Sequence, residues 1–353
     1  MCSLDLLSIP FIFGTIFKIK FWKKTLKKVL YPLTLLFVFS VYVATFSGGL
    51  HIESISLFGI TDLEKTIILE LRLPKIITAI LVGISLSIAG HLYQLLLSNP
   101  LAEPSLLGVS GLCSLFIILG ATVCALYGIK YDVFFILLFA CIGSGVALLG
   151  VFQIAKRLGN YSSSSLILSG ICITTMTSAI ISWLIYYSNN EQLRQFSMWM
   201  LGSFEHVSYS LLYLVGAIVV VITAYILFSK HKLDLIYLGD KNAQLYGLDT
   251  RKYRRNNLIL ASVLTACAVT LGGMITFIGL LIPHATRLIF GHSNKRIVPL
   301  LIINGALIMI VIEWLSRTLT VYQLPISLIT TCIGGPIFLA VLFSNFKNRA
   351  SYA

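Results

Sequence analysis

A polar segment with two prolines, SNPLAEPSLLG at residues 98–108, separates two long uncharged stretches of the chain. Glu103 is the single formal charge in this region. Pro100 and Pro104 disfavour helical conformation at the residues that precede them, Asn99 and Glu103. A carboxylate in this setting is either solvated in a tight turn or part of a functional site. The spacing alone leaves both interpretations open.

Two further pairs of ionisable residues have helical spacing. His284 and Arg287 are three residues apart in IPHATRLIFG, so one helix face would carry both side chains. Glu313 and Arg317 are four residues apart, an order that stabilises a helix slightly. Arg287 and Arg317 also have a simpler interpretation. Their long side chains would extend along apolar surface until the charged end reaches the membrane interface.

The usual signatures of catalysis and metal binding are absent from the sequence. It has no G-x-x-x-x-G-K-[ST] phosphate-binding loop, no paired carboxylates, no G-x-S-x-G motif and no His/Cys metal-ligand spacing. The seven cysteines are scattered without a C-x-x-C motif, which favours small buried residues. We therefore expect no enzyme activity of the chain alone, no resident cofactor and no metal site.

The composition is typical of a membrane protein. Of 353 residues, 58% are hydrophobic and 11% are charged, and the mean hydropathy is +0.94. Soluble domains carry about 25% charged residues, and a helix that crosses a bilayer core needs about 20 apolar residues. The sequence predicts an all-α polytopic protein with about ten spans. They lie near residues 29–47, 75–97, 106–127, 132–156, 161–187, 206–229, 257–273, 275–291, 297–316 and 325–345.

The distribution of charge predicts the orientation of these spans. With the N-terminus in the cytoplasm, the inside segments contain 20 Lys and Arg residues and the outside segments contain 6, as the positive-inside rule expects. We therefore expect a basic cytoplasmic segment at 1–28, a single transmembrane domain at 29–345 and a cytoplasmic tail at 346–353. The net charge of +13 then reflects basic loops near the membrane surface and not binding of nucleic acid.

Residues 230–257 form the longest cytoplasmic segment that this arrangement leaves between spans. Leu235, Leu238, Ala243 and Leu245 give it a weak helical stripe, which Gly247 ends. The segment is either a basic loop drawn to anionic lipid or a docking element for a cytoplasmic partner. Its spacing does not distinguish these two possibilities.

Three longer motifs resemble the permease subunits of type II ATP-binding-cassette importers, the siderophore, haem and vitamin B12 family. They are LRLPKIITAILVGISLSIAGHLYQLLLSNPLAEPSLLGVS at 71–110, GMITFIGLLIPHATRLIFGHSNKRIVPL at 273–300 and LPISLITTCIGGPIFLAVL at 324–342. LGDKNAQLYGLDTRKYR at 238–254 is similar to the cytoplasmic coupling segment of that family, and LRQFSMWMLG at 193–202 also resembles it. The resemblance runs from about residue 30 to 345 in the family's order.

This resemblance implies an architecture and a set of partners. Two permease copies, most often a homodimer, would form the pathway in the bacterial cytoplasmic (inner) membrane. Spans 2–5 and 7–10 would form inverted repeats. A separate ATPase subunit would dock on the cytoplasmic side and hydrolyse ATP, and a periplasmic or lipid-anchored binding protein would deliver the ligand. The cargo would be a ferric siderophore, haem or cobalamin, and the motifs leave that choice open.

The resemblance also assigns roles to individual residues. Three cations would meet glutamates of the binding protein: Arg72, Lys75 and Arg317. Lys75 stands where the family usually has arginine, so it keeps the charge but loses a bidentate contact. Four residues would form the cytoplasmic constriction: Asn99 and Leu101, with Ser163 and Ser164 in a second layer. Contacts with the ATPase would come from Leu238, Gly239, Ala243, Leu245 and Gly247.

An alternative from a different class is a stand-alone, proton-coupled secondary transporter. It would use ionisable groups inside the membrane, for which Glu103, His284 and Glu313 are the candidates. So few embedded carboxylates argue against a proton relay. For Glu103 we favour a structural role, in which the carboxylate accepts backbone hydrogen bonds at the start of the third span.

Overall fold

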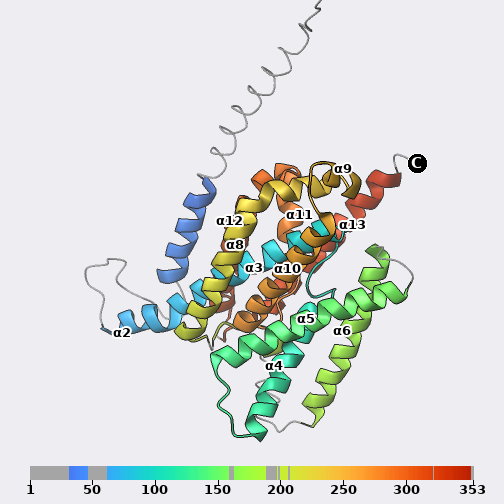
Figure 1. Ribbon diagram of the computed structural model, residues 1–353. Helices are drawn as coiled ribbons and strands as arrows, with labels where there is room; N and C mark the ends of the chain where they lie inside the picture. The colour runs from blue at the N-terminus through green and yellow to red at the C-terminus, as the bar shows by residue number, and fades with distance from the viewer. Residues whose placement is uncertain are drawn as a thin grey trace, which may run out of the picture.

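The computed structural model describes residues 32–46, 62–158, 163–187, 197, 199–205, 207–320 and 322–350. Every regular element within these residues is a helix, and Figure 1 shows them gathered into one bundle. This confirms the predicted all-α class. The basic segment 1–28, most of the loop that follows the first span, and residues 351–353 of the tail lie outside the described residues.

The helices follow the predicted spans in order. They are Pro32–Phe46, α2 (Asp62–Thr66), the π-helix η1 (Ile67–Arg72), α3 (Leu73–Leu96), α4 (Val109–Leu126), α5 (Val133–Arg157), α6 (Ser163–Tyr186), α8 (Tyr209–Tyr237), α9 (Asp240–Leu245), α10 (Thr250–Gly272), α11 (Ile278–Phe290), α12 (Asn294–Thr318) and α13 (Ile326–Ala350). Seven are long and apolar enough to cross a bilayer, and three more are shorter apolar helices. The chain is therefore a polytopic helical membrane protein, and the count of ten spans stays a prediction.

Helix extends beyond two of the predicted spans. Before the second span, predicted from residue 75, helix runs without a break from Asp62 through η1 into α3. The π-helical turn ends two residues before Pro74, whose missing N–H interrupts a normal helical ladder. Much of the segment 230–257, for which a weak helical stripe was predicted, is also helical. Charged residues can continue a helix beyond the bilayer, so α8 extends to Tyr237 and α10 already begins at Thr250.

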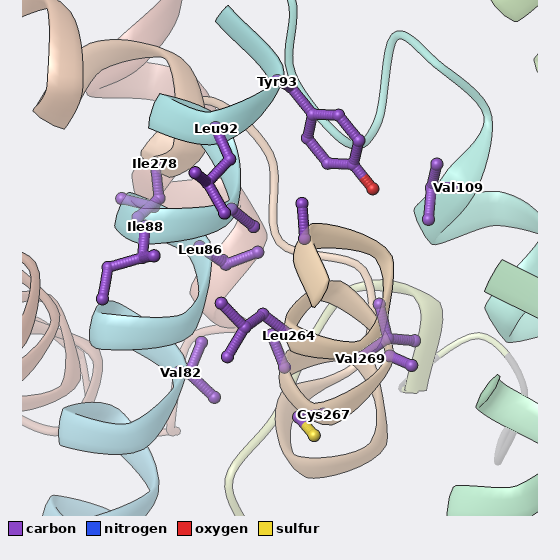
Figure 2. Packing of buried hydrophobic residues seen from close by; sticks show 14 of the residues in the cluster. Val82, Leu86, Ile88, Leu92, Tyr93, Val109, Leu264, Cys267, Val269 and Ile278 are labelled. Carbon is purple, nitrogen blue, oxygen red and sulfur yellow. The ribbon is translucent and has the colours of Figure 1, made fainter. Parts of the chain in front are cut away.

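Helix α3 is the centre of the bundle. It packs against α8, α10, α11 and α12, and Figure 1 shows it among them. Between Leu81 and Leu96 every residue except Ile84 is buried. Figure 2 shows Leu86 and Leu264 between the ribbons of α3 and α10, with the Tyr93 ring extending from α3 toward Val109 of α4. The position of α3 therefore determines where its neighbours lie.

Glycine pairs bring α3 into backbone contact with two of these neighbours. A Cβ atom added to Gly83 would lie 2.1 Å from the Gly305 carbonyl oxygen of α12. A Cβ added to Gly90 would lie 1.8 Å from the Gly279 carbonyl oxygen of α11. Lipid tails are as apolar as leucine, so membrane helices associate largely through such close packing. The two pairs hold α11 and α12 against α3.

We expect Gly90→Ala to destabilise the fold, because the new methyl group meets the Gly279 backbone, which cannot move aside without displacing α11. Its thermal midpoint in detergent should fall by on the order of 5 °C. Gly145→Ala in α5 is the matched control, since a Cβ there meets no described atom within 4 Å. Equal midpoints for the two variants, measured by fluorescence-detected size exclusion, would contradict the close packing.

Candidate functional site

The loop between α3 and α4 holds the residues of the expected constriction. Ser98 has a left-handed backbone (φ 50°), which turns the chain sharply out of α3. Asn99 then accepts a hydrogen bond from the Leu101 N–H through its own Oδ1, at 2.8 Å. This local turn holds Asn99 and Leu101 in fixed relation, and both are half-buried. We refer to residues 97–108 as the gate loop.

Glu103 ties the gate loop to the start of α11. Its side chain is only 4% exposed. The carboxyl group accepts a hydrogen bond from the Ser105 hydroxyl, and the backbone N–H of Phe277 lies near enough to lower its pKa. Phe277 precedes α11 with a left-handed backbone (φ 68°) and provides no side-chain cap. A carboxylate at a helix N-terminus is favoured by the unpaired N–H groups and the helix dipole.

This bears on the sequence interpretation of Glu103. The backbone N–H that lies near its carboxyl group precedes α11 and not the third span. Sequence alone could not identify this partner, because the two residues are 174 positions apart. Burial raises the pKa of the Glu103 carboxyl from 4.5 to about 7, although the Ser105 hydroxyl and the Phe277 N–H lower it.

The raised pKa predicts a pH-dependent stability. The folded chain binds this proton more tightly than the unfolded chain, so the group favours folding fully below about pH 4.5 and loses that contribution as pH rises through about 7. We expect Glu103→Gln, which keeps an acceptor for the Phe277 N–H, to flatten the fall of the thermal midpoint between pH 5 and 8. Parallel curves for the variant and the wild type would contradict the assignment.

Helix α6 contacts the gate loop from the other side. Thr174 donates to the Ser105 carbonyl at 3.3 Å, and a Cβ added to Gly170 would lie 2.5 Å from the Leu106 carbonyl oxygen. Ser163 begins α6 and Ser164 is exposed in its first turn. The structure thus places α6 beside the gate loop through Thr174 and Gly170. No described hydrogen bond joins Ser164 to Asn99.

A buried chain of hydrogen bonds that the sequence analysis missed connects four helices near the same end of α3. Arg287 of α11 contacts His91 Nδ1 through Nη1 at 3.2 Å, and His91 Nε2 lies 2.6 Å from Asn294 Oδ1 of α12. Asn294 donates its side-chain amide to Asp234 of α8 at 3.0 Å. Arginine only donates, so Nδ1 must accept and Nε2 must carry the proton.

The donors and acceptors of this chain of hydrogen bonds therefore follow a fixed order. It runs from the Arg287 cation through the neutral His91 imidazole and the Asn294 amide to the Asp234 carboxylate. Arg287 also donates to Gln94, which lies one turn after His91 on α3. The suggested partner of Arg287, His284, is not the one it contacts. The sequence held one signal for this contact: a histidine and a glutamine three residues apart within a predicted span, since embedded polar groups usually meet one another.

The three cations Arg72, Lys75 and Arg317 have partners within the chain. Arg72 is buried and donates to the Thr45 carbonyl at 2.8 Å. Arg317 donates to the Ala44 carbonyl at 2.8 Å. Both carbonyls belong to the last turn of the helix Pro32–Phe46, where cations are favoured. The two arginines thus fasten the first helix to the bundle.

Glu313 is the counter-ion of this cluster. It is fully buried, and the predicted pair with Arg317 is present, with Nε 2.6 Å from Oε1. Lys75 is the least engaged of the three cations, since its described bond is to a neutral partner, Gln323, at 2.7 Å. The structure brings all three cations together around Glu313. Their role toward a partner protein stays a prediction.

The short helix α9 lies at the end of the bundle opposite α2 (Figure 1). Ala243 packs inward and is buried, whereas Leu238 and Leu245 are 50% and 85% exposed. Gly239 and Gly247 flank the helix with φ of 87° and 79°. These are left-handed conformations that other residues adopt only with strain. Of the five expected coupling residues, Ala243 and Leu245 lie in α9. Gly239 and Gly247 flank that helix, and Leu238 directly follows α8.

Comparison with known proteins places this geometry in a family. The model of the FecCD transport family matches residues 32–344. The vitamin B12 import system permease protein BtuC of Vibrio vulnificus is 32% identical over 330 residues, which cover 92% of this chain and 95% of the relative. The hemin transport system permease protein HmuU of Yersinia pestis is 32% identical over 290 residues, with 80% and 84% covered. The chain belongs to the FecCD transport family.

Other relatives agree with this membership. A Helicobacter pylori permease named for iron chelatin transport is 33% identical over 296 residues, covering 83% of this chain and 86% of the relative. A solved chain described as an inward-facing conformation of an ABC transporter of the metal-chelate type aligns with a TM-score of 0.78 and 28% identity, over 90% of this chain and 99% of the other. This FecCD chain is a multi-pass permease of the bacterial cytoplasmic membrane.

Proposed function

We propose that this chain is the pathway-forming subunit of an importer that moves an iron chelate, haem or vitamin B12 into the cell, with energy from a separate ATPase subunit. The family match over residues 32–344 carries the proposal, together with relatives named for vitamin B12, hemin and iron chelatin transport. The proton-coupled alternative is not favoured by this membership.

In this proposal both termini are cytoplasmic, the chain has ten spans, spans 2–5 and 7–10 are inverted repeats, and two copies form the pathway. Asn99 and Leu101 of each copy constrict its inner end, with Ser163 and Ser164 as a second layer. The half-burial of Asn99 and Leu101 and the local turn that fixes them support a constriction of defined shape. A constriction must hold one geometry until the ATPase acts, and this turn provides it.

The ATPase would dock on α9. Two exposed leucines, Leu245 at the end of α9 and Leu238 just before that helix, suit insertion into an apolar groove of a partner. Ala243, with its small buried side chain, lets the helix lie close to its own bundle. Gly239 and Gly247 supply the turns that direct the helix outward.

We expect Leu245→Glu to reduce recovery of the ATPase subunit with the affinity-tagged permease by about tenfold, because a desolvated carboxylate would replace an apolar anchor. The thermal midpoint of the permease itself should not change, since Leu245 is 85% exposed. Tyr322→Glu, at a residue that is 86% exposed between α12 and α13, is the matched control. Undiminished recovery with Leu245→Glu would exclude α9 as the docking helix.

The binding protein would dock at the opposite end, near Arg72, Lys75 and Arg317. Because the two arginines also fasten the first helix, their reversal would disturb folding as well as docking. Lys75 separates these effects, since its partner Gln323 is neutral.

We expect Lys75→Ala to raise the Kd of the binding protein by roughly threefold to tenfold at low salt. Lys130→Ala, at an exposed lysine in the loop before α5, should leave the Kd unchanged. Equal Kd values for the two variants would show that Lys75 is not part of the interface.

The decisive experiment is reconstitution. The permease, its ATPase and its binding protein are placed in proteoliposomes, and uptake of a radiolabelled ferric hydroxamate chelate, haem or cobalamin is measured. Uptake that requires ATP and the binding protein supports the proposal. Uptake that continues without ATPase and stops when the proton gradient is removed would support the secondary transporter instead.

A further inference from the structure

The side chain of Arg254 joins two parts of the proposed machinery. It belongs to the first turns of α10, and its side chain is 24% exposed. Its Nη2 and Nε donate to Asp240 Oδ1 at 2.9 and 3.2 Å. Its Nη1 donates to the carbonyl oxygen of Leu96. Asp240 is the first residue of α9, and Leu96 is the last residue of α3.

The Leu96 carbonyl at the end of α3 lacks a helical donor because of a proline. In a continuing helix, the N–H of residue 100 would donate to the Leu96 carbonyl. Residue 100 is Pro100, which has no N–H. The neighbouring carbonyls of Tyr93, Gln94 and Leu95 accept from Leu97, Asn99 and Ser98 respectively. The arginine thus takes the position that the SNP sequence leaves open.

A cation is well suited to this position. The last carbonyls of a helix carry partial negative charge, which a nearby guanidinium stabilises. The guanidinium is also planar with several donors, so one side chain can hold a carboxylate and a carbonyl at the same time. A lysine could provide the charge but not the same two-sided geometry.

From these contacts we propose that Arg254 is a positioning residue that transmits displacement of α9 to the gate loop. The inference rests on the proposed function, in which α9 receives the ATPase and the gate loop forms the constriction. Gly239 and Gly247 allow α9 to turn relative to α8 and α10, and a Cβ at either would meet no described atom within 4 Å. The ion pair then carries movement of Asp240 to Arg254, and the carbonyl contact carries it to residues 97–101.

The test uses the reconstituted complex of permease, ATPase and binding protein, with the radiolabelled ferric hydroxamate chelate and cobalamin as probes. Uptake and ATP hydrolysis are measured together. Arg254→Gln should retain the ATPase and its hydrolysis, while uptake per ATP hydrolysed falls by about tenfold. Arg157→Gln, at an exposed arginine that ends α5, should keep the wild-type ratio. A loss of overall stability would lower both activities and leave the ratio unchanged.

A charge swap separates the two contacts. Arg254→Asp combined with Asp240→Arg restores an ion pair between α9 and α10, but an aspartate cannot donate to the Leu96 carbonyl. The proposal expects the swapped variant to keep the complex assembled and to keep uptake per ATP hydrolysed low. A ratio restored by the swap, or an unchanged ratio in Arg254→Gln, would overturn it. So would loss of the ATPase from both variants, because Arg254 would then be a docking contact.

These outcomes are distinct from failure of the proposed function. If the wild-type complex shows no ATP-dependent uptake of either probe, the importer assignment fails for those cargoes. If the wild-type complex transports and Arg254→Gln matches Arg157→Gln in uptake per ATP, only the role of Arg254 fails.

Discussion

The structure depends on the backbone contact of α3 with α11 and α12 at glycine residues. Gly83 with Gly305 and Gly90 with Gly279 leave no room for a side chain between the helices. This close approach brings α11 within hydrogen-bonding range of α3, where Gln94 donates to the Leu280 carbonyl at 3.2 Å. It also brings the start of α11 to the gate loop, where a Cβ added to Gly279 would lie 3.1 Å from Pro104 Cδ. With larger residues at these positions, the polar contacts could not form.

Buried charges at both ends of the bundle are compensated in the same way. A buried ion is costly unless it is paired or hydrogen-bonded. At one end Arg287 is connected to Asp234 through His91 and Asn294. At the other end Arg317 pairs with Glu313 and donates to the Ala44 carbonyl. Each arginine thus fastens separate helices while its charge is compensated.

Much of the architecture could be predicted because long apolar stretches have few alternatives in a bilayer. Each of the ten predicted spans corresponds to a helix. The boundaries were harder, since hydropathy marks where a helix leaves the membrane and not where it ends. Thus α8 runs on through charged residues to Tyr237, and helix begins at Asp62, well before the predicted start of the second span.

Partners of individual side chains were harder still to predict. The Glu103 carboxylate was recognised as unusual, yet the Phe277 N–H near it depends on how α11 packs against α3. His91 and Asn294 are 203 residues apart, so no local spacing indicates their contact. The Glu313–Arg317 pair was predictable because both residues lie on one helix. In general, contacts within an element could be read from spacing, and contacts between elements could not.

Pro100 has one more consequence. It removes the donor that the next turn of α3 would need, so extension of this helix into the gate loop would leave the Leu96 carbonyl without a helical partner. A movement of Asn99 and Leu101 about the turn at Ser98 avoids that loss, whereas winding them into a longer helix does not. In the proposed pathway, residues 99–101 would then move together about the turn at Ser98.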